Sequence, residues 1–422
     1  MDKNTLSNYG WIVIAVLVLS VMIALATPFG NYIQKGAQNT LNGLIDVNNE
    51  AINLDNFYGN NWEYSMLKDY HGGLFVPNTD NFVLLDTEDG KVEANWYNLV
   101  VYDFLKFENG VLGNGSRVSE MEGELRISKE VASIMKSRWD SSSLFLYQSK
   151  ISNIVLLDGI VEIGDWAFSQ MPELTSITIP ASLEKIGTGV LRQATKLNTI
   201  IVDENNKHFT SIDNVLYTKD RKELVKYPNA KTNKEYTIID ECEKIRAHAF
   251  AFTNASGLSD LYFGKNVTEV QQQVFERAPI KNIYINEKCN NIMWGWIRNT
   301  PNVVIHLNEN NKAFKVIDNV LYNYEMTSLN SIGYQEDDKI VIPDGIQSVG
   351  ILCNNAHYIT IPASVTEIAE YSFICAGSGR KINIVYDGTG EQWMNINKGY
   401  ATLDTKESNA YILSISTITF LK

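Results

Sequence analysis

The sequence contains few of the residues that build a reactive site. Only four cysteines occur in 422 residues, and no C-x-x-C pair is present. The five histidines are scattered, and none has a second His, Cys or carboxylate at a metal-ligand spacing such as H-E-x-x-H. The nucleophile elbow G-x-S-x-G, the phosphate loop G-x-x-x-x-G-K and the dinucleotide fingerprint G-x-G-x-x-G are also missing. The sequence therefore predicts no enzyme, no metal site and no cofactor.

A strongly basic segment is lacking as well. The formal net charge is -13, and Lys and Arg form no run. Because proteins that bind nucleic acid draw their affinity from clustered Lys and Arg, nucleic acid is not an expected partner. A charged fraction of 20% and an aromatic fraction of 11% also differ from the composition of a disordered chain.

What the sequence does contain is an internal repeat of ten residues. Positions 1, 3, 7 and 10 are apolar in all eight copies, in a chain that is 45% apolar overall. Several successive copies begin 19 to 25 residues apart. The copies begin at Leu125, Ile154, Ile177, Tyr236, Leu261, Ile283, Ile340 and Ile359.

Each copy predicts a coil that begins with a short β-strand. Positions 1 and 3 have the period of a strand, and Pro or Asp-Gly commonly follows and ends it. Such a coil cannot bury its own apolar face, so the repeats predict a stacked solenoid with one continuous core. Five residues after position 10 we expect a short helical turn that carries a bulky plug, at Trp139, Phe168, Leu191, Phe250, Phe275, Ile297 and Phe373.

Three further coils diverge from the repeat and begin at Ile200, Ile305 and Ile382. The first two are followed by a cassette, S-I-D-N-V-L-Y or V-I-D-N-V-L-Y, and residues 211–228 predict a β-hairpin inserted on the coil. The D-E-N-N and N-E-N-N stretches at 203–206 and 308–311 are rich in oxygen, like calcium loops. They lack the ligand spacing of an EF-hand, so we interpret them as tight turns.

The repeat, together with the cassette N-N-K-x-F-x-x-I-D-N-V-L-Y and the stretch Y-D-G-T-G-E-Q-W, resembles the BspA-like leucine-rich repeats of bacterial cell-surface proteins. The resemblance covers residues 125–399, about two thirds of the chain. It implies a curved extracellular solenoid used for binding or adhesion, with no reaction attached.

The N-terminal residues 1–30 predict a transmembrane anchor. Residues 11–27 carry no charge and run on to Pro28, a span of about 20 residues that is long enough to cross a bilayer through residues 11–28. Lys3 favours an N-terminus on the inside, with the bulk of the chain extracellular. The alternative is a signal peptide cleaved near Ala26, which would make the protein secreted.

Three further segments complete the expected organisation. Residues 31–54 predict an amphipathic stalk helix, residues 55–120 a small mixed α/β cap over the first coil, and residues 121–422 the solenoid with hairpin insertions and a C-terminal cap. A strand over residues 411–420 is expected to close the far end. The cap contains aromatic residues that we interpret as core rather than as a carbohydrate platform, namely Trp62, Tyr64, Tyr70, Trp96, Tyr97 and Tyr102.

The cysteines predict no disulfide between Cys242 and Cys289. Both occupy position 7, but a whole coil separates them, and two strand spacings of about 4.8 Å exceed the reach of a disulfide. We therefore expect buried free thiols. Cys353 and Cys375 lie in successive coils, where free thiols are also favoured over a bridge.

Position 2 of the repeat points outward and supplies the candidate binding residues. Tyr262 and Tyr284 belong to successive coils and should lie side by side, and exposed Tyr is typical of interfaces. Thr178 and Thr360 occupy the same position. The competing interpretation is that β-branched and aromatic residues are there to stabilise the strand ladder. The outward column comprises Arg126, Val155, Thr178, Thr237, Tyr262, Tyr284, Val341 and Thr360.

The sequence thus predicts a β-rich repeat solenoid with one short strand per coil plus turns or short helices, an N-terminal transmembrane helix and a mixed α/β cap. The expected function is non-enzymatic binding of an extracellular protein or glycan. The alternative is a structural envelope or pilus-like assembly component anchored by its N-terminal helix.

Overall fold

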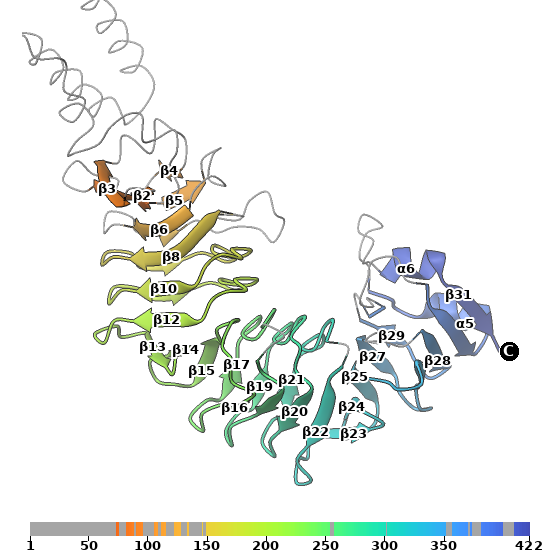
Figure 1. Ribbon diagram of the computed structural model, residues 1–422. Helices are drawn as coiled ribbons and strands as arrows, with labels where there is room; N and C mark the ends of the chain where they lie inside the picture. The colour runs from red at the N-terminus through yellow and green to blue at the C-terminus, as the bar shows by residue number, and fades with distance from the viewer. Residues whose placement is uncertain are drawn as a thin grey trace, which may run out of the picture.

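The computed structural model describes residues 149–422 except 254–256, 301, 352–356, 370–371, 374–380 and 400–408, and, before them, residue 146 and seven strands between residues 73 and 134. Short rungs stack on one another, and the stack curves through an arc (Figure 1). The expected anchor, stalk helix and cap aromatics lie outside these residues. Within them, no helix is long and apolar enough to cross a membrane.

One parallel sheet contains the strand at positions 1 to 3 of each repeat, as expected. It is divided into three parts along the chain. The N-terminal part comprises β1 (Gly73–Phe75), β6 (Glu122–Ile127), β8 (Lys150–Leu156), β10 (Ser176–Ile179) and β12 (Thr199–Val202). The middle part comprises β16 (Glu235–Thr237), β18 (Asp260–Tyr262), β20 (Asn282–Ile285) and β22 (Val304–Leu307). The C-terminal part comprises β26 (Lys339–Val341), β28 (Tyr358–Pro362), β30 (Asn383–Asp387) and β31 (Thr417–Phe420). We call this the first sheet.

A second sheet runs along the other side of the rungs and was not expected. In most repeats its strand is only the two residues at positions 9 and 10, too short to show the alternation by which strands are recognised. Its N-terminal part comprises β4 (Leu105–Glu108), β5 (Val111–Asn114), β7 (Ser133–Ile134), β9 (Glu162–Ile163) and β11 (Lys185–Ile186). The middle part comprises β13 (Phe209–Ile212), β14 (Val215–Thr218), β15 (Glu223–Lys226), β17 (Lys244–Ile245), β19 (Glu269–Val270) and β21 (Asn291–Ile292). The C-terminal part comprises β23 (Phe314–Ile317), β24 (Val320–Asn323), β25 (Ser328–Ile332), β27 (Ser348–Ile351) and β29 (Glu367–Ile368).

The two sheets enclose the four apolar columns, as the repeat predicts. Every described residue of these columns is buried except Tyr236 and Ile186, which are half-buried. The plugs Phe168, Phe250, Phe275 and Phe373 are fully buried, and Leu191 and Ile297 nearly so, whereas Trp139 lies outside the described residues.

The plugs sit in turns rather than in the short helices that their Ala-Phe pairs suggested. These turns place two residues four positions apart in the left-handed region, for example His248 (φ 62°) and Phe252 (φ 58°), which a helix does not allow. Gly189 (φ 68°) holds the first such position in its turn, and a Cβ there would come within 2.3 Å of the Trp166 ring. A backbone bond from the Phe250 amide to the Val274 carbonyl (3.0 Å) joins one turn to the next.

The hairpin expected at residues 211–228 is present and is part of a larger element. β13, β14 and β15 form an antiparallel meander, and β15 then pairs in parallel with β17 as a rung of the second sheet. β23, β24 and β25 repeat this arrangement, with a bulge at the equivalent place, before β27. We call these the first and second cassettes. In Figure 1 both lie where the stack bends.

The cassettes divide the core that the repeats predict to be continuous. Val215 and Tyr217 of β14 pack into the middle core, whereas the buried side chain of Leu216 between them does not belong to it. In β24, Leu321 packs into the middle core, and Val320 and Tyr322 pack into the next one. The central strands β14 and β24 therefore each separate two cores and present one apolar face to each core. The expectation of one continuous core is wrong because the V-L-Y sequence has no polar face.

The interpretation of the two N-N stretches as turns is confirmed. Asn206 is fully buried, and its amide donates to the carbonyls of Pro180 and Leu183 at 2.7 and 3.0 Å. Its carbonyl oxygen accepts from two amides of its own turn. Asn311 makes the equivalent four bonds in the later coil. These side chains link one rung to the next, so their oxygens are already used.

The cysteine expectation is confirmed for Cys242 and Cys289, which are free and buried. Burial raises the pKa of each thiol to about 12, which keeps it protonated and unreactive. Cys353 and Cys375 lie outside the described residues.

The C-terminal end differs in part from the expectation. Residues 411–415 belong to helix α6 (Asn409–Ile415), and only β31 is a strand, which pairs with β30 and closes the first sheet. Helix α5 (Gly390–Asn395) begins with a capping box between Thr389 and Gln392, as the T-G-E-Q sequence favours. The register aligns Ile384, not Ile382, with Ile359.

The segment expected to form a cap contributes rungs. β1 pairs with β6 in the first sheet, and β5 pairs with β7 in the second. β2 (Phe82–Thr87) and β3 (Gly90–Asn95) form a separate antiparallel hairpin. Both sheets thus begin upstream of residue 121.

Replacing Phe250 by Ala should lower the free energy of unfolding by about 3–5 kcal/mol, the usual loss for a buried Phe. Its ring stacks between Tyr227 (centroids 5.0 Å apart) and Phe275 (5.2 Å), so the cavity would open inside the aromatic column. Urea unfolding followed by far-UV circular dichroism measures the change. Thr237→Ala, on the exposed face, is the control and should change stability by less than about 0.5 kcal/mol. Equal effects would contradict a core made of stacked plugs.

Candidate functional site

The outward column of the middle part carries a stack of aromatic rings. Tyr262 of β18 and Tyr284 of β20 lie with ring centroids 4.4 Å apart and planes within 8°. His306 of β22 stacks on Tyr284 at 4.4 Å and 10°. The parallel register places the three residues directly opposite one another. The expectation that the two tyrosines lie side by side is confirmed, and their role in binding stays a prediction.

Sequence reasoning missed His306, although a signal existed. His306 occupies position 2 of the divergent coil that begins at Ile305, and the outward column was drawn only from the eight regular copies. Including the divergent coils would have extended the column by one ring. We call Tyr262, Tyr284 and His306 the aromatic ladder.

A line of hydrogen-bonded polar side chains ends at His306 of the ladder. His306 Nε2 lies 3.0 Å from Asn282 Oδ1, and the Asn282 amide donates to Asp260 Oδ1 at 2.7 Å. Since the Asn282 oxygen is an acceptor, His306 donates from Nε2. The chain His306 to Asn282 to Asp260 crosses the same three strands as the rings do, and it orients the His306 ring.

The close packing of the ladder shifts the pKa of Tyr262. Desolvation, and then the neighbouring Tyr284 and Asp260, raise the pKa of Tyr262 above its ordinary value. The Tyr262 hydroxyl therefore stays neutral at physiological pH and acts as a hydrogen-bonding group. Because the rings stack face to face, they present their edges rather than their inner faces.

The structure does not bring Thr178 and Thr360 to the ladder. Thr178 lies on β10 in the N-terminal part and Thr360 on β28 in the C-terminal part, each half-exposed. Their neighbours in register are apolar and exposed, namely Ile201 (51% exposed) beside Thr178 and Val341 (71%) beside Thr360. The four predicted residues therefore lie on three separate columns of one outward face.

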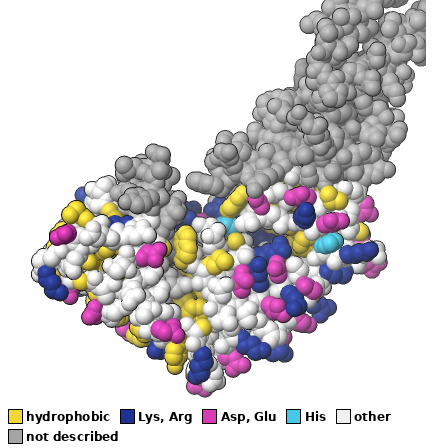
Figure 2. Space-filling model, turned by 180° about the vertical axis from the view of Figure 1, so that it is seen from behind, with side chains coloured by type: hydrophobic (Ala, Val, Ile, Leu, Met, Phe, Trp, Pro, Cys, Tyr) yellow, Lys and Arg dark blue, Asp and Glu magenta, His cyan; other side chains and the backbone are white. Residues whose placement is uncertain are grey.

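The outward face of the second sheet has a different chemistry. Lys244 of β17 lies between Glu223 of β15 (3.5 Å) and Glu269 of β19 (3.6 Å). Opposite charges thus alternate across neighbouring strands, where each pair adds a little stability. Figure 2 shows charges of both signs interspersed on the N-terminal side of its visible face and hydrophobic side chains gathered near the centre.

A buried ion pair crosses the first cassette. Arg192, in the turn after β11, donates from Nε and Nη2 to both carboxylate oxygens of Glu276, each at 2.9 Å. The two residues are 84 positions apart, so no sequence pattern signals the pair. His248 Nδ1 lies 3.6 Å from the same carboxylate, and burial lowers the pKa of His248. The pair joins the N-terminal part to the middle part.

The second cassette is crossed by neutral bonds instead. Trp296 Nε1 donates to the buried Ser331 hydroxyl at 2.7 Å, and the Asn330 amide donates to the Ile292 carbonyl at 2.6 Å. At the first cassette, Arg246 from the turn after β17 donates to the equivalent carbonyl of Ile186 at 3.4 Å. At both breaks a side chain thus caps the last strand of the preceding part.

Among the described residues, no three His, Cys, Asp or Glu side chains are arranged to hold a metal ion.

Comparison with known protein families decides the family. The profile described as BspA type leucine rich repeat region matches six copies, within residues 141–246, 226–338 and 334–390, which is more than half of the chain. The chain belongs to the BspA-type leucine-rich repeat family. The family resemblance given by the repeat and the cassette is thereby confirmed. A search of curated proteins found no significant match.

Solved structures of bacterial leucine-rich repeat proteins also match this BspA-type chain. A leucine-rich repeat protein from Eubacterium ventriosum is 17% identical, with a TM-score of 0.36 over 79% of this chain and 98% of that one. The pneumococcal vaccine antigen PcpA is 14% identical, with a TM-score of 0.33 over 71% and 79% of the two chains. A leucine-rich cell surface protein from Faecalibacterium prausnitzii is 16% identical, with a TM-score of 0.29 over 78% and 96%.

The aromatic ladder predicts unequal effects of removing its two tyrosines. Tyr284→Ser removes two stacked pairs and Tyr262→Ser removes one, and each pair contributes about 0.5–1.5 kcal/mol. Tyr284→Ser should therefore destabilise the protein more, by about 1 kcal/mol, in urea unfolding. Val341→Ser, at the same position in another column, controls for loss of a large outward side chain. Equal losses at the two tyrosines would contradict the stack.

The buried ion pair predicts a pH-dependent role for Glu276. Burial alone would raise the pKa of its carboxyl, but contacts with His248 and Arg192 lower that pKa to about 2. Glu276→Gln leaves the half-buried Arg192 without its charge partner, so it should lower the free energy of unfolding by about 3 kcal/mol at neutral pH, the lower end for a buried pair.

The sign of the pH effect follows from the lowered pKa. The folded state favours the carboxylate of Glu276. Its contribution to the free energy of unfolding is therefore complete above the ordinary pKa of 4.5 and is lost as pH falls toward about 2. The difference between wild type and Glu276→Gln, from urea unfolding at several pH values, should narrow over that range. Glu173→Gln, in the exposed Lys196 pair, is the control and should cost at most about 1 kcal/mol. A difference that does not change with pH would contradict the buried pair.

Proposed function

We propose that this BspA-type protein is a non-enzymatic binding or adhesion protein of the cell surface, and that the aromatic ladder is the centre of its contact with an extracellular protein. The observation that carries the proposal is the stack of Tyr262, Tyr284 and His306 on the outward face of the middle rungs. Tyr is enriched in protein interfaces because it combines a large apolar ring with a hydroxyl. A solenoid also holds such residues at fixed spacing, which lowers the entropy lost on binding.

The ring geometry favours a protein partner over a glycan. The inner ring faces are occupied by one another at 4.4 Å, so the ladder offers edges and hydroxyl groups to a partner. Sugar recognition by aromatic residues relies on an exposed ring face, whereas protein interfaces use Tyr edges and hydrogen bonds equally well. The exposed Ile201 and Val341 on the flanking columns supply apolar area for a partner that is longer than one column.

The proposal includes the expected anchor. A span through residues 11–28 would hold the solenoid at the outside of the membrane, and cleavage near Ala26 would release the same solenoid as a secreted protein. Both forms leave the ladder accessible to a partner. Cell fractionation with N-terminal sequencing separates them, because an intact Met1 indicates anchoring and a start at Thr27 indicates secretion.

A paired array experiment tests the proposed function. The wild-type chain is applied at micromolar concentration to immobilised extracellular matrix proteins and to a glycan array. We expect saturable binding to a protein, weakened at least about tenfold by the double substitution Tyr262→Ser and Tyr284→Ser, a loss of about 1.4 kcal/mol or more. Thr178→Ala, on another column, should bind like wild type.

Three results would argue against the proposal. Binding to glycans alone would contradict the choice of a protein partner. Binding that the double substitution leaves intact would contradict the ladder as the contact. No binding to either array, together with filaments that disappear when residues 1–53 are removed, would favour a structural assembly role.

A further inference from the structure

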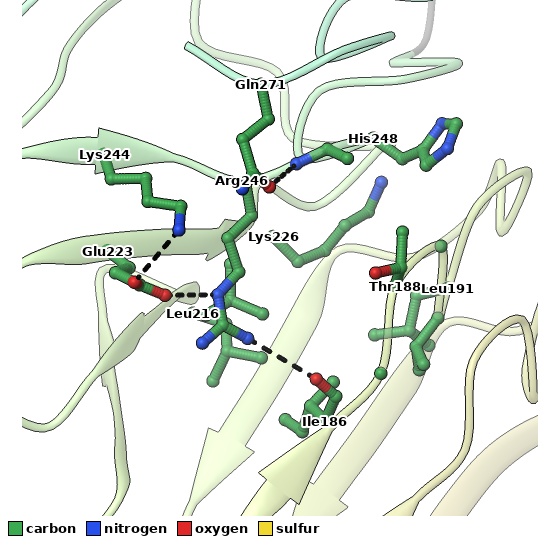
Figure 3. Close-up of a pocket in the computed structure, with 15 residues that line it drawn as sticks. Ile186, Thr188, Leu191, Leu216, Glu223, Lys226, Lys244, Arg246, His248 and Gln271 are labelled. Atoms are coloured by element: carbon green, nitrogen blue, oxygen red, sulfur yellow. Dashed lines mark hydrogen bonds and ion pairs between the residues drawn. The ribbon is translucent and has the colours of Figure 1, made fainter. Parts of the chain in front are cut away.

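A pocket lies between the N-terminal part of the solenoid and the first cassette. Its volume is about 260 Å³. One wall is the chain from Ile186 to Leu191, which follows the last strand before the cassette, and the opposite wall comes from β14, β15 and β17. The aromatic ladder is not part of it. Figure 3 shows the ionisable side chains that line the pocket, Glu223, Lys226, Lys244, Arg246 and His248.

Lys226 is the unusual residue of this pocket. It is 2% exposed, which is rare for a lysine without a counter-ion. Its amine donates a hydrogen bond to the Ala251 carbonyl at 3.5 Å, the outer limit for such a bond. In Figure 3 the Lys226 amine lies between His248 and the Thr188–Leu191 segment, away from Glu223.

The neighbouring carboxylates are already committed to other cations. Glu223 contacts Arg246 at 2.5 Å and Lys244 at 3.5 Å. Glu276 accepts hydrogen bonds from two nitrogens of Arg192. Among the residues that the structure describes, no carboxylate forms an ion pair with Lys226. Burial, and then the charge of Arg192, lower the pKa of Lys226 to about 7.

Apolar side chains also line the pocket. Leu216, Val225, Leu191 and Ile186 are among its lining residues, together with Thr188. A bare inorganic anion would leave these apolar side chains without a contact. A molecule with one carboxylate and a small organic body would satisfy both the amine and the walls.

The second cassette shows that the fold does not need a lysine here. Ser331 occupies the equivalent position on β25, and its buried hydroxyl accepts the Trp296 N–H at 2.7 Å. The side chain at this position of the second cassette is therefore satisfied internally. The first cassette keeps a buried cation without such a partner.

We propose that the pocket binds a small organic monocarboxylate, with Lys226 as the counter-ion of its carboxylate. The ligand touches both the N-terminal part and the first cassette, so its binding also fixes these two parts together. The site is separate from the macromolecular contact proposed for the ladder, and either assignment stands without the other.

Isothermal titration calorimetry on the full chain tests the site. The probes are lactate and glucuronate, with glucose and the methyl ester of glucuronate as neutral matches and inorganic phosphate as a bare anion. We expect at least one carboxylate to bind with one-to-one stoichiometry. Lys226→Met should weaken this binding at least about tenfold, and Lys234→Met, at an exposed lysine outside the pocket, should not change it.

The proposal is overturned if neither carboxylate binds at millimolar concentration, if the neutral matches bind equally well, or if phosphate binds as tightly as the carboxylates. It is also overturned if Lys226→Met binds like wild type. Lys226→Ser, which copies the second cassette, replaces Lys226→Met if circular dichroism shows that the methionine variant is unfolded.

The pH dependence tests the site in wild-type protein alone. The protonated fraction of Lys226 rises as pH falls through about 7, so binding should strengthen from pH 8.5 to 6.5, by up to about 25-fold. His248 stays neutral above 6.5 because burial lowers its pKa, and Glu276, with a pKa of about 2, stays charged. Arg192 remains paired with Glu276, and Glu223 remains paired with both Lys244 and Arg246. Binding that does not change over this range would contradict Lys226 as the counter-ion.

Discussion

The inability of a single rung to bury its own apolar face is the constraint on which the rest of the structure depends. Each rung offers side chains from two short strands and one turn, and these are covered only by the equivalent side chains of its neighbours. The plugs show this most directly, because Phe250 packs between Tyr227 and Phe275 of the adjacent rungs. The turn that carries Phe250 is tied to the next turn by a backbone bond, so the polar groups of the rung also find partners on its neighbours.

The cassettes interrupt this regularity at a structural cost that the chain offsets locally. Their central strands are apolar on both faces, and each separates two cores rather than joining them. A break in the sheet leaves strand carbonyls without a neighbouring strand, and a buried carbonyl without a partner is unfavourable. Arg246 and Asn330 supply side-chain donors to the carbonyls of Ile186 and Ile292 at the two breaks. The buried pair of Arg192 and Glu276 adds a second link across the first break.

The sequence predicted the features that follow from a visible period or register and missed those that leave no such pattern. Four apolar columns, the hairpin of the cassette and the pairing of Tyr262 with Tyr284 follow from period and register, which are local properties. The second sheet was missed because a strand of two residues shows no alternation. The plug turns were expected to be helical because an Ala-Phe pair suits a helix as well as a tight turn. The pair of Arg192 and Glu276 depends on how the parts pack, and residues 84 positions apart carry no shared pattern.

The positions of the two candidate sites follow from the difference between regular rungs and the breaks at the cassettes. In a regular rung the backbone groups bond to those of the neighbouring rungs, so few polar groups are left without a partner, and only the outward columns are free to vary. That freedom allows Tyr and His to stack at position 2 without any effect on the core. At a break, the neighbouring groups are not copies of one another, and a buried polar group must find its own partner. Ser331 finds one in Trp296, whereas Lys226 at the equivalent place faces a pocket. A repeat protein can therefore carry two independent sites, one built from the regularity of its rungs and one from the interruption of that regularity.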